Sequence, residues 1–583
     1  MKKHILLCAA LALSSFGLPS CSDILDQKPL DSYTDTAVWG DLSLAESFLN
    51  YCYLRVEAEN TNGVMFCNYT DETYHMHDYG TSTYTQGRAS CDNYNTGWTE
   101  GKGNTWSHYY GGIKLCNQLL EDIMDTPANT DSEKEWKNQI IGQGYFLRAY
   151  YYHMLYSVYG RIPLIDHTYD LDSEFKEERA DMDDVADFIV ADCDKAAELL
   201  PTVYKDASDF GRATKGAALA LKGRVLLYKA SPLFGTPSRE KWQAAADANK
   251  AVIDMNIYSL KQVSNSDEYA DLFFDSKNPE VIFEKLYDEK GIAGSSASLV
   301  MQAPAGPGNG YEGWSTWQPT YEIVELFQNA DGTPYKPAET KPFTILQTTI
   351  DPDSGEATQK EVTIQASDVN PWEGREIRLK ANILYDGMLW GYGDSNREIE
   401  LFEAGAKGVI PGKDSRTGET WWNGTKTGYN MRKFLSSHIN FYDDTVVDTT
   451  PWFFIRLAEV YLNYAECQIE LGNNAEALKY INLIRNRALL PDATGKDIRT
   501  EYERTVELMF EGQRFFDLRR WKKMEETYSK EHWPTGLKIY KLQNGTKIYY
   551  HNPEAVQQRN FDASKNYWWP IPRYELNKST LLD

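Results

Sequence analysis

The stretch RLAEVYLNYAECQIELGNNAEALKYINLIRNR, residues 456–487, decides the fold class. Its small, aromatic and aliphatic residues follow the spacing of a tetratricopeptide unit and are Ala458, Tyr461, Tyr464, Ala465, Ala477 and Ile481. Small residues let two antiparallel helices approach closely. Gly472 lies between the two halves, where a helix can end because glycine tolerates left-handed backbone. The stretch therefore predicts a helical hairpin.

Upstream segments show the same helical period, with apolar residues at i, i+3, i+4 and i+7. Such segments are 42–54, the region from Trp106 onward, 136–159, 182–199, 215–230 and 239–255. Helices of similar length joined by short polar turns are typical of stacked hairpins. We expect an N-terminal helical scaffold over 41–261 and C-terminal tetratricopeptide-type helices over 451–583.

Two regions lack this period. Residues 59–104 are rich in Tyr, Asn and Gly, and residues 262–450 contain frequent turn signals such as Asp331-Gly332 and Asp351 to Gly355. An irregular region of such length in a compact protein is usually functional or disordered. We therefore predict a mainly α fold: a tetratricopeptide-type helical-hairpin scaffold with a large insertion of loops and short strands at 262–450, and a binding loop at about 59–104.

The composition and net charge limit the kinds of molecule that this chain is expected to bind. The 583 residues carry a formal charge of -25, and no basic stripe follows the first three residues. Binding to phosphate backbones requires clustered Lys and Arg that release counterions, so no nucleic acid partner is expected.

The N-terminus reads as an export signal. Lys2 and Lys3 precede an apolar run over 5–13, and small residues lead to Cys21. This pattern predicts a signal peptide at 1–20. Residues Leu18 to Cys21 resemble a bacterial lipobox, which implies acylation of Cys21 and a lipid tether over 21–40. The alternative is an ordinary signal peptide followed by a chance cysteine.

Catalytic and metal motifs are missing from the sequence. There is no nucleophile elbow, phosphate-binding loop or zinc-protease helix, and we expect no enzyme activity, no cofactor and no metal. His75 to Asp78 reads as a polar loop rather than a metal site, and Asp351 to Gly355 as a turn rather than a calcium loop. We interpret the late charged cluster as structural ion pairing; it comprises Arg514, Asp517, Arg519 and Arg520.

Several segments, in this order, together resemble the SusD/RagB family of nutrient-binding outer-membrane lipoproteins. They are Cys21 with Leu25-Asp26 and Pro29, Phe146 to Tyr151, Tyr159 to Leu164, Gly211 to Thr214, Leu227-Tyr228, Pro319-Thr320, Asp331-Gly332, Arg456 to Glu466, Asn482 to Ala488, Glu511 to Trp521 and Pro570 to Leu576. The resemblance implies a helical fold with several tetratricopeptide units and a variable ligand-binding insertion. It also implies a surface-exposed position on the outer membrane, where the protein covers a SusC-type TonB-dependent transporter as a lid.

Tryptophans in the irregular regions mark the predicted binding site. Half of the 16 tryptophans fall within 91–110 and 311–425. A sugar ring packs its C–H face on an indole or phenol, which supplies contact area at little entropic cost. The predicted ligand-binding residues are Trp98, Tyr311, Trp314, Trp317, Trp390 and Tyr392, with Asp71 and Arg88 as hydroxyl ligands. Trp421-Trp422 could face a sugar or the transporter.

The leading hypothesis is a glycan-binding lipoprotein that captures oligosaccharides or polysaccharide and delivers them to the transporter without breaking a covalent bond. One alternative is an exported glycoside hydrolase with an aromatic cleft, which needs two carboxylates across that cleft. Another is a tetratricopeptide scaffold for a peptide. Tryptophans in loops favour sugar over peptide.

Overall fold

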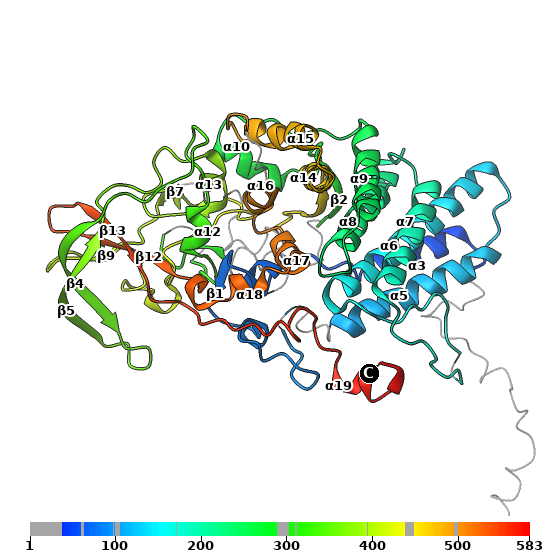
Figure 1. The fold of residues 1–583 in the computed structure, drawn as a ribbon, viewed down its shortest axis with the longest axis horizontal. Helices are drawn as coiled ribbons and strands as arrows, with labels where there is room; N and C mark the ends of the chain where they lie inside the picture. Colours follow the sequence, from blue (N-terminus) through cyan, green and yellow to red (C-terminus); the bar gives the residue numbers. More distant parts are fainter. Residues whose placement is uncertain are drawn as a thin grey trace, which may run out of the picture.

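The computed structural model describes residues 38–59, 63–96, 98, 105–170, 172–287, 302–308, 312–392, 395–437, 448–494 and 500–582. Long helices gather at one end of an elongated molecule, and strands β4, β5, β9, β12 and β13 lie at the other (Figure 1). The predicted signal peptide, Cys21 and the predicted tether as far as residue 37 lie outside the described residues.

The N-terminal scaffold consists of seven helices: α3 (Leu42–Tyr53), α4 (Thr81–Thr85), α5 (Thr105–Asp122), α6 (Asp131–Tyr159), α7 (Met182–Leu199), α8 (Lys215–Ala230) and α9 (Arg239–Asp254). Local signals set their ends. At the start of α6, Thr130 Oγ1 accepts from the Glu133 backbone N–H at 3.2 Å, and Glu133 Oε2 accepts from the Thr130 N–H at 2.8 Å. This reciprocal capping satisfies donors that the first turn leaves unpaired. Gly160, at φ +73°, ends the helix.

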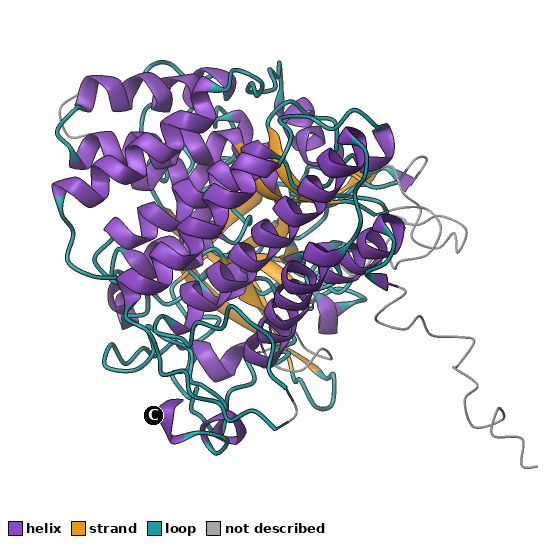
Figure 2. Ribbon diagram, turned by 90° about the vertical axis from the view of Figure 1, so that its right-hand side faces the viewer, coloured by secondary structure: helices purple, strands orange, loops and turns teal. Residues whose placement is uncertain are grey.

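The predicted hairpin is present as α14 (Leu457–Glu470) and α15 (Asn474–Arg487), with Gly472 at φ +85° between them. Helices α5 to α9 pack in succession, and α14 packs on α9. Figure 2 shows helices packed side by side over much of the molecule, with strands among them. Arg224 of α8 donates to Glu459 of α14 at 2.7 Å, with both side chains buried. The hairpin therefore continues the N-terminal stack, although about 200 residues of sequence separate α9 from α14.

The chain leaves the helical stack at the start of the insertion and returns to it at the same place. Strand β2 (Val281–Lys285) pairs antiparallel with β11 (Trp452–Arg456), which runs directly into α14. Between them lie β3 (Trp317–Pro319), α12 (Tyr321–Glu325), β4 (Lys341–Ile350), β5 (Ala357–Ala366), α13 (Ile377–Asn382), β6 (Ile383–Leu384), β7 (Leu389–Trp390), β8 (Arg397–Glu398), β9 (Glu403–Ala404) and β10 (Asn430–Met431); α10 (Ser266–Asp271) precedes β2. Pairing of β2 with β11 holds the two ends of the insertion together.

One hairpin of the insertion is longer than the sequence predicted. Strands β4 and β5 pair over ten residues each, where we expected short strands. The predicted turn closes this hairpin: Asp351 accepts from the backbone N–H groups of Asp353 and Ser354 at 3.1 and 2.8 Å. Most side chains of β5 are exposed, so apolar residues were too few for a strong strand signal.

The remaining C-terminal elements are α16 (Thr500–Glu507), α17 (Gln513–Arg520), α18 (Met524–Thr527), β12 (Gly536–Lys541), β13 (Lys547–Asn552) and α19 (Arg573–Leu576). Strand β12 lies between β13 and β9, with Tyr540 opposite Glu403 in parallel register. The C-terminal segment and the insertion thus share a sheet.

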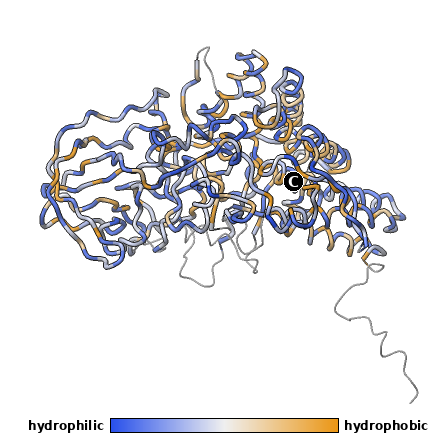
Figure 3. Tube along the Cα trace, turned by 60° about the horizontal axis from the view of Figure 1, so that its bottom comes forward, coloured by the Kyte–Doolittle hydropathy of each residue, from blue (hydrophilic) through white to orange (hydrophobic). Residues whose placement is uncertain are grey.

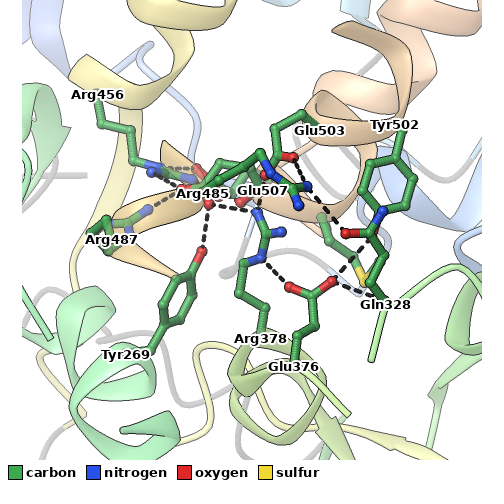
Figure 4. Close-up of polar contacts among 12 residues, drawn as sticks. Tyr269, Gln328, Glu376, Arg378, Arg456, Arg485, Arg487, Tyr502, Glu503 and Glu507 are labelled. Carbon is green, nitrogen blue, oxygen red and sulfur yellow. Dashed lines mark hydrogen bonds and ion pairs between the residues drawn. The ribbon is translucent and has the colours of Figure 1, made fainter. Parts of the chain in front are cut away.

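A buried ion-pair network joins the C-terminal helices to the insertion (Figure 4). Its cations are Arg378, Arg456, Arg485, Arg487 and Lys433, and its carboxylates are Glu280, Glu376, Glu503, Glu507 and Glu511. The five positive charges match the five negative charges. A buried ion costs several kcal/mol unless it is paired, so this balance is what allows the network to lie inside the protein.

The late charged cluster is also structural, as predicted. Asp517 pairs with Arg520 at 2.8 Å and with Arg504 at 2.9 Å, and all three side chains are buried. Arg519 differs from the expected ion pairing, because it donates to backbone carbonyls, including that of Tyr567 at 2.9 Å. Neither arrangement leaves a guanidinium open to bind an anion.

Within the described part of the chain, no helix combines the length and the apolar character that crossing a membrane requires. Orange and blue alternate along the helices in Figure 3, as in amphipathic helices that bury one face. The same residues contain no group of three His, Cys, Asp or Glu side chains placed to hold a metal ion. Their six cysteines are all free thiols.

Candidate functional site

A short strand pair brings two distant loops together. β1 (Thr73–His75) pairs antiparallel with β3, and His75 lies opposite Trp317. The Met76 N–H donates to Thr316 O at 2.9 Å, which extends the ladder by one bond. Beyond this hydrogen bond the two segments enter loops, at residues 76–80 and 312–316. The early irregular region and the insertion therefore meet at this point, as expected for two halves of one site.

Both loops hold unusual backbone conformations. Asp78 and Tyr79 have φ of 67° and 43°, and Glu312 and Ser315 both have φ of 45°. Left-handed backbone is unfavourable for residues other than glycine and persists only where surrounding structure enforces it. Such strain concentrates at ligand-binding sites. Two strained segments side by side make this surface the leading candidate for function.

Trp314 is the exposed aromatic residue at this surface. Its side chain is 40% exposed, and its ring centre lies 6.0 Å from that of His77 at an interplanar angle of 80°. The ring of Tyr79 lies 6.3 Å from that of His77 between centres. Backbone bonds from Gly313 to Pro304 O (3.0 Å) and from Ser315 to Ala303 O (3.1 Å) fix the loop on either side of the tryptophan. The result is an indole held open to solvent beside two more rings.

Polar groups surround this aromatic cluster. Burial lowers the pKa of His77 despite a hydrogen bond to the Trp314 backbone, and the positive charge of Lys426 lowers it further. The imidazole is thus neutral at pH 7, and its Nε2 has no partner among the described residues. Lys426 Nζ lies 3.2 Å from Tyr74 Oη. A face for stacking, with donors and acceptors at its rim, suits a ring that carries hydroxyl groups.

Arg88 belongs to the same neighbourhood. Asp78 accepts from the Ser82 N–H and from Ser82 Oγ, both at 2.6 Å. Arg88 Nη2 in turn donates to Ser82 Oγ at 2.7 Å. The exposed guanidinium is therefore linked, through one serine, to the loop that carries His77 and Tyr79.

Two predicted tryptophans occupy different environments from the one we expected. Trp98 is only 3% exposed and stacks on Phe66 at 4.3 Å between ring centres. Trp317 is fully buried, and its Nε1 donates to Gly63 O at 3.0 Å. Both indoles are covered by protein, so neither presents an open face in this structure. Sequence could not reveal this, because the partners that cover them come from distant segments.

The other predicted ligand-binding residues also lie in different environments. Asp71 is bound by Arg514 at 2.6 Å between Oδ2 and Nη2, so its carboxylate serves an internal ion pair instead of an open hydroxyl site. Trp390 is buried in the insertion. Tyr392 is half-buried, and its side chain packs against the main hydrophobic core. Tyr311 lies outside the described residues. Of the predicted residues, the structure places Trp314 and Arg88 at the strained surface.

Sequence reasoning missed His77, Tyr79 and Lys426 as parts of this surface. The sequence predicts a polar loop from His75 to Asp78 and no metal site. In the structure His75 ends β1 and is buried at 2% exposure, and the loop begins at Met76, with His77 beside Trp314. The sequence feature that could have indicated this surface is the closeness of Tyr79 to His75 and His77 in an irregular region. Lys426 has no local signal of its own.

Two family models match the chain. Residues 279–583, slightly more than half of the chain, match the model described as the SusD family. Residues 23–227 match a model described as starch-binding, associating with the outer membrane. The second match covers the early loop and the scaffold as far as residue 227 in α8, and the first covers the insertion from residue 279 onward and the C-terminal helices. Helix α9 lies between the two matches.

Individual relatives agree along the whole length. SusD-like protein P2 of Formosa agariphila is 24% identical over 626 aligned positions, which span 100% of this chain and 99% of that protein. A SusD-like protein from Bacteroides fragilis superposes with a TM-score of 0.74 at 25% identity, covering 96% of this chain and 99% of that one. A SusD-like carbohydrate-binding protein from the same species has the same fold at 22% identity, with a TM-score of 0.69 and coverage of 94% and 100%. Sequence, helical stack and insertion thus agree, and the chain belongs to the SusD family.

Proposed function

We propose that this protein binds an oligosaccharide or polysaccharide at the surface centred on Trp314 and does not cleave it. The observation that carries the proposal is the half-exposed indole, held between fixed backbone bonds beside His77 and Tyr79. The names of structural relatives support the ligand class, since one is described as carbohydrate binding and another as laminarin binding. Lys426, whose charge acts on His77, and Arg88, which is linked through Ser82 to Asp78 of the same loop, supply hydrogen-bond donors.

We further propose that the bound glycan passes to a SusC-type TonB-dependent transporter in the outer membrane. The match to a model described as associating with the outer membrane supports this location. Acylation of Cys21 would hold the protein at the cell surface, because several acyl chains anchor a protein stably without a spanning helix. A Cys21→Ala variant is then expected in the soluble fraction, with no incorporation of labelled fatty acid.

Calorimetry against a panel of polysaccharides tests the binding proposal. For any glycan that the parent protein binds, Trp314→Ala should weaken binding by roughly tenfold or more, since ~1.5–3 kcal/mol of apolar contact is lost. Tyr51→Ala is the control, because Tyr51 is also an exposed aromatic residue but lies on α3 of the helical scaffold. Equal affinity in Trp314→Ala and parent would refute the site. Release of new reducing ends from the glycan would instead favour the hydrolase alternative.

A further inference from the structure

Two cavities meet on the helical scaffold, away from β1 and β3. One of about 430 Å³ lies between the loop at 202–212 and β2, and one of about 320 Å³ lies between α3 and β2. Both are lined by Phe210, Gly211, Arg212, Phe283 and Glu284. Their volumes reach the size range of small-ligand sites. The surface they share is therefore a concave feature that the carbohydrate proposal does not use.

Glu284 is an unusual group to find in the wall of these cavities. It is only 6% exposed, and its Oε2 has neither a hydrogen-bond partner nor an ion pair within the described ranges of the chain. Burial raises the pKa of its carboxyl to about 8, and the negative charge of Asp275 adds to the rise. A buried carboxyl without a partner costs free energy that a cation could recover.

The cations nearby are already engaged. Arg212 lies 2.8 Å from Asp209 and 3.4 Å from Glu46. Lys285 donates to the backbone carbonyl of Val56 at 2.7 Å. Within the described residues, no hydrogen bond or ion pair joins either cation to Glu284. The described part of the chain therefore supplies no cationic partner for this carboxyl.

The mouths of the cavities are apolar. Five large hydrophobic side chains that line them are between 36% and 68% exposed: Leu54, Val203, Phe210, Ile257 and Leu286. Clustered exposed apolar residues mark sites of protein association. Interface hot spots commonly consist of one anchoring side chain in a pocket, surrounded by contacts that exclude water. This rim of five apolar side chains would add no binding energy for a small hydrophilic amine.

We propose that this surface docks a partner protein by receiving one of its arginine or lysine side chains against Glu284, with apolar residues of the partner on the surrounding rim. The guanidinium or ammonium group would supply the charge that Glu284 lacks, and its methylene stem would pack on Phe210. The inference does not rest on the proposed carbohydrate site, because no residue is shared between the two surfaces. The two experiments can therefore fail independently.

The test uses two short peptides on the full-length folded protein. The probe is acetyl-Leu-Arg-Phe-amide, and its control is acetyl-Leu-Gln-Phe-amide. By ligand-observed NMR and calorimetry, the parent should bind the arginine peptide at least tenfold more tightly. Glu284→Gln should abolish this preference. Glu198→Gln, the same substitution on the exposed side of α7, should retain it.

A second variant keeps the test decisive should Glu284→Gln not fold. Phe210→Ser alters an exposed rim residue and should weaken both peptides by a similar factor. Equal binding of the two peptides by the parent, or an undiminished preference in Glu284→Gln, would overturn the proposal. Butylammonium ion binding as tightly as the arginine peptide would also overturn it, since the apolar rim would then contribute nothing.

Discussion

Arg456 and Glu507 form a fully buried ion pair, with 2.9 Å between Nη1 and Oε1 and no more than 1% exposure on either side chain. Arg456 ends the strand that closes the insertion, and Glu507 ends α16. Glu507 also binds Arg487 and Arg378, which reach it from α15 and from the insertion. One carboxylate therefore connects three parts of the chain and links the insertion to the helical stack.

Replacing Glu507 by glutamine should be among the most destabilising single-atom changes in this protein. The substitution removes a charge that faces three guanidinium groups, and breaking a buried pair from one side costs about 3–5 kcal/mol. Urea unfolding should show this loss at pH 7. Asp131→Asn is the control, because it breaks an exposed pair with Lys134 and should cost no more than about 0.5 kcal/mol. Similar losses in the two variants would contradict the structural role of the network.

The network should also make the protein sensitive to acid. Burial alone raises the pKa of Glu507, but Arg487, Arg456 and Arg378 hold it well below its usual range. Such a carboxylate stabilises the fold fully above its unfolded pKa near 4.5, and this contribution is lost as the pH falls through the folded pKa. The free energy of unfolding should therefore drop as the pH falls below about 5. The drop should be smaller in Glu507→Gln, and equal slopes would count against this explanation.

Much of the fold could be predicted because a packed helix shows a periodic pattern of apolar residues in its own sequence. The apolar period of 182–199, 215–230 and 239–255 matches α7, α8 and α9 to within one residue, since each helix buries one face against its neighbour. The hairpin at 456–487 is marked by its small residues for the same reason. By contrast, the β4–β5 hairpin buries few side chains, so its sequence shows only a weak strand pattern. Packing of α14 on α9, across the insertion, has no local signature at all.

The site could be predicted by region but only partly by residue. Trp98 and Trp314 both lie among glycines in irregular sequence, and nothing local separates them. What separates them is the tertiary environment: the ring of Phe66 covers Trp98, whereas Trp314 is 40% exposed. Burial of an aromatic ring in a loop depends on contacts between distant segments, which composition and spacing do not encode.

Trp98→Ala should consequently affect stability more than binding. Truncation of a buried tryptophan typically costs about 3–5 kcal/mol, because it removes apolar contacts and leaves a cavity. The folded fraction should retain the parent affinity for any glycan that binds, as measured by calorimetry well below the melting temperature. Trp314→Ala should show the reverse, with little change in melting temperature and a clear loss of affinity. A binding loss in Trp98→Ala with unchanged stability would return Trp98 to the ligand site.

Glu284→Gln should stabilise the protein, in contrast to Glu507→Gln. Since burial raises the pKa of Glu284 to about 8, the folded state keeps a proton that the unfolded state releases above pH 4.5. Stability of the parent then falls as the pH rises between these values, by up to about 1.4 kcal/mol per pH unit. Glutamine resembles the protonated acid and carries no such cost. The advantage of the variant should grow from pH 5 to pH 8 in urea unfolding and then level off, and a variant less stable than the parent at pH 8 would show that Glu284 has a cationic partner in the folded chain.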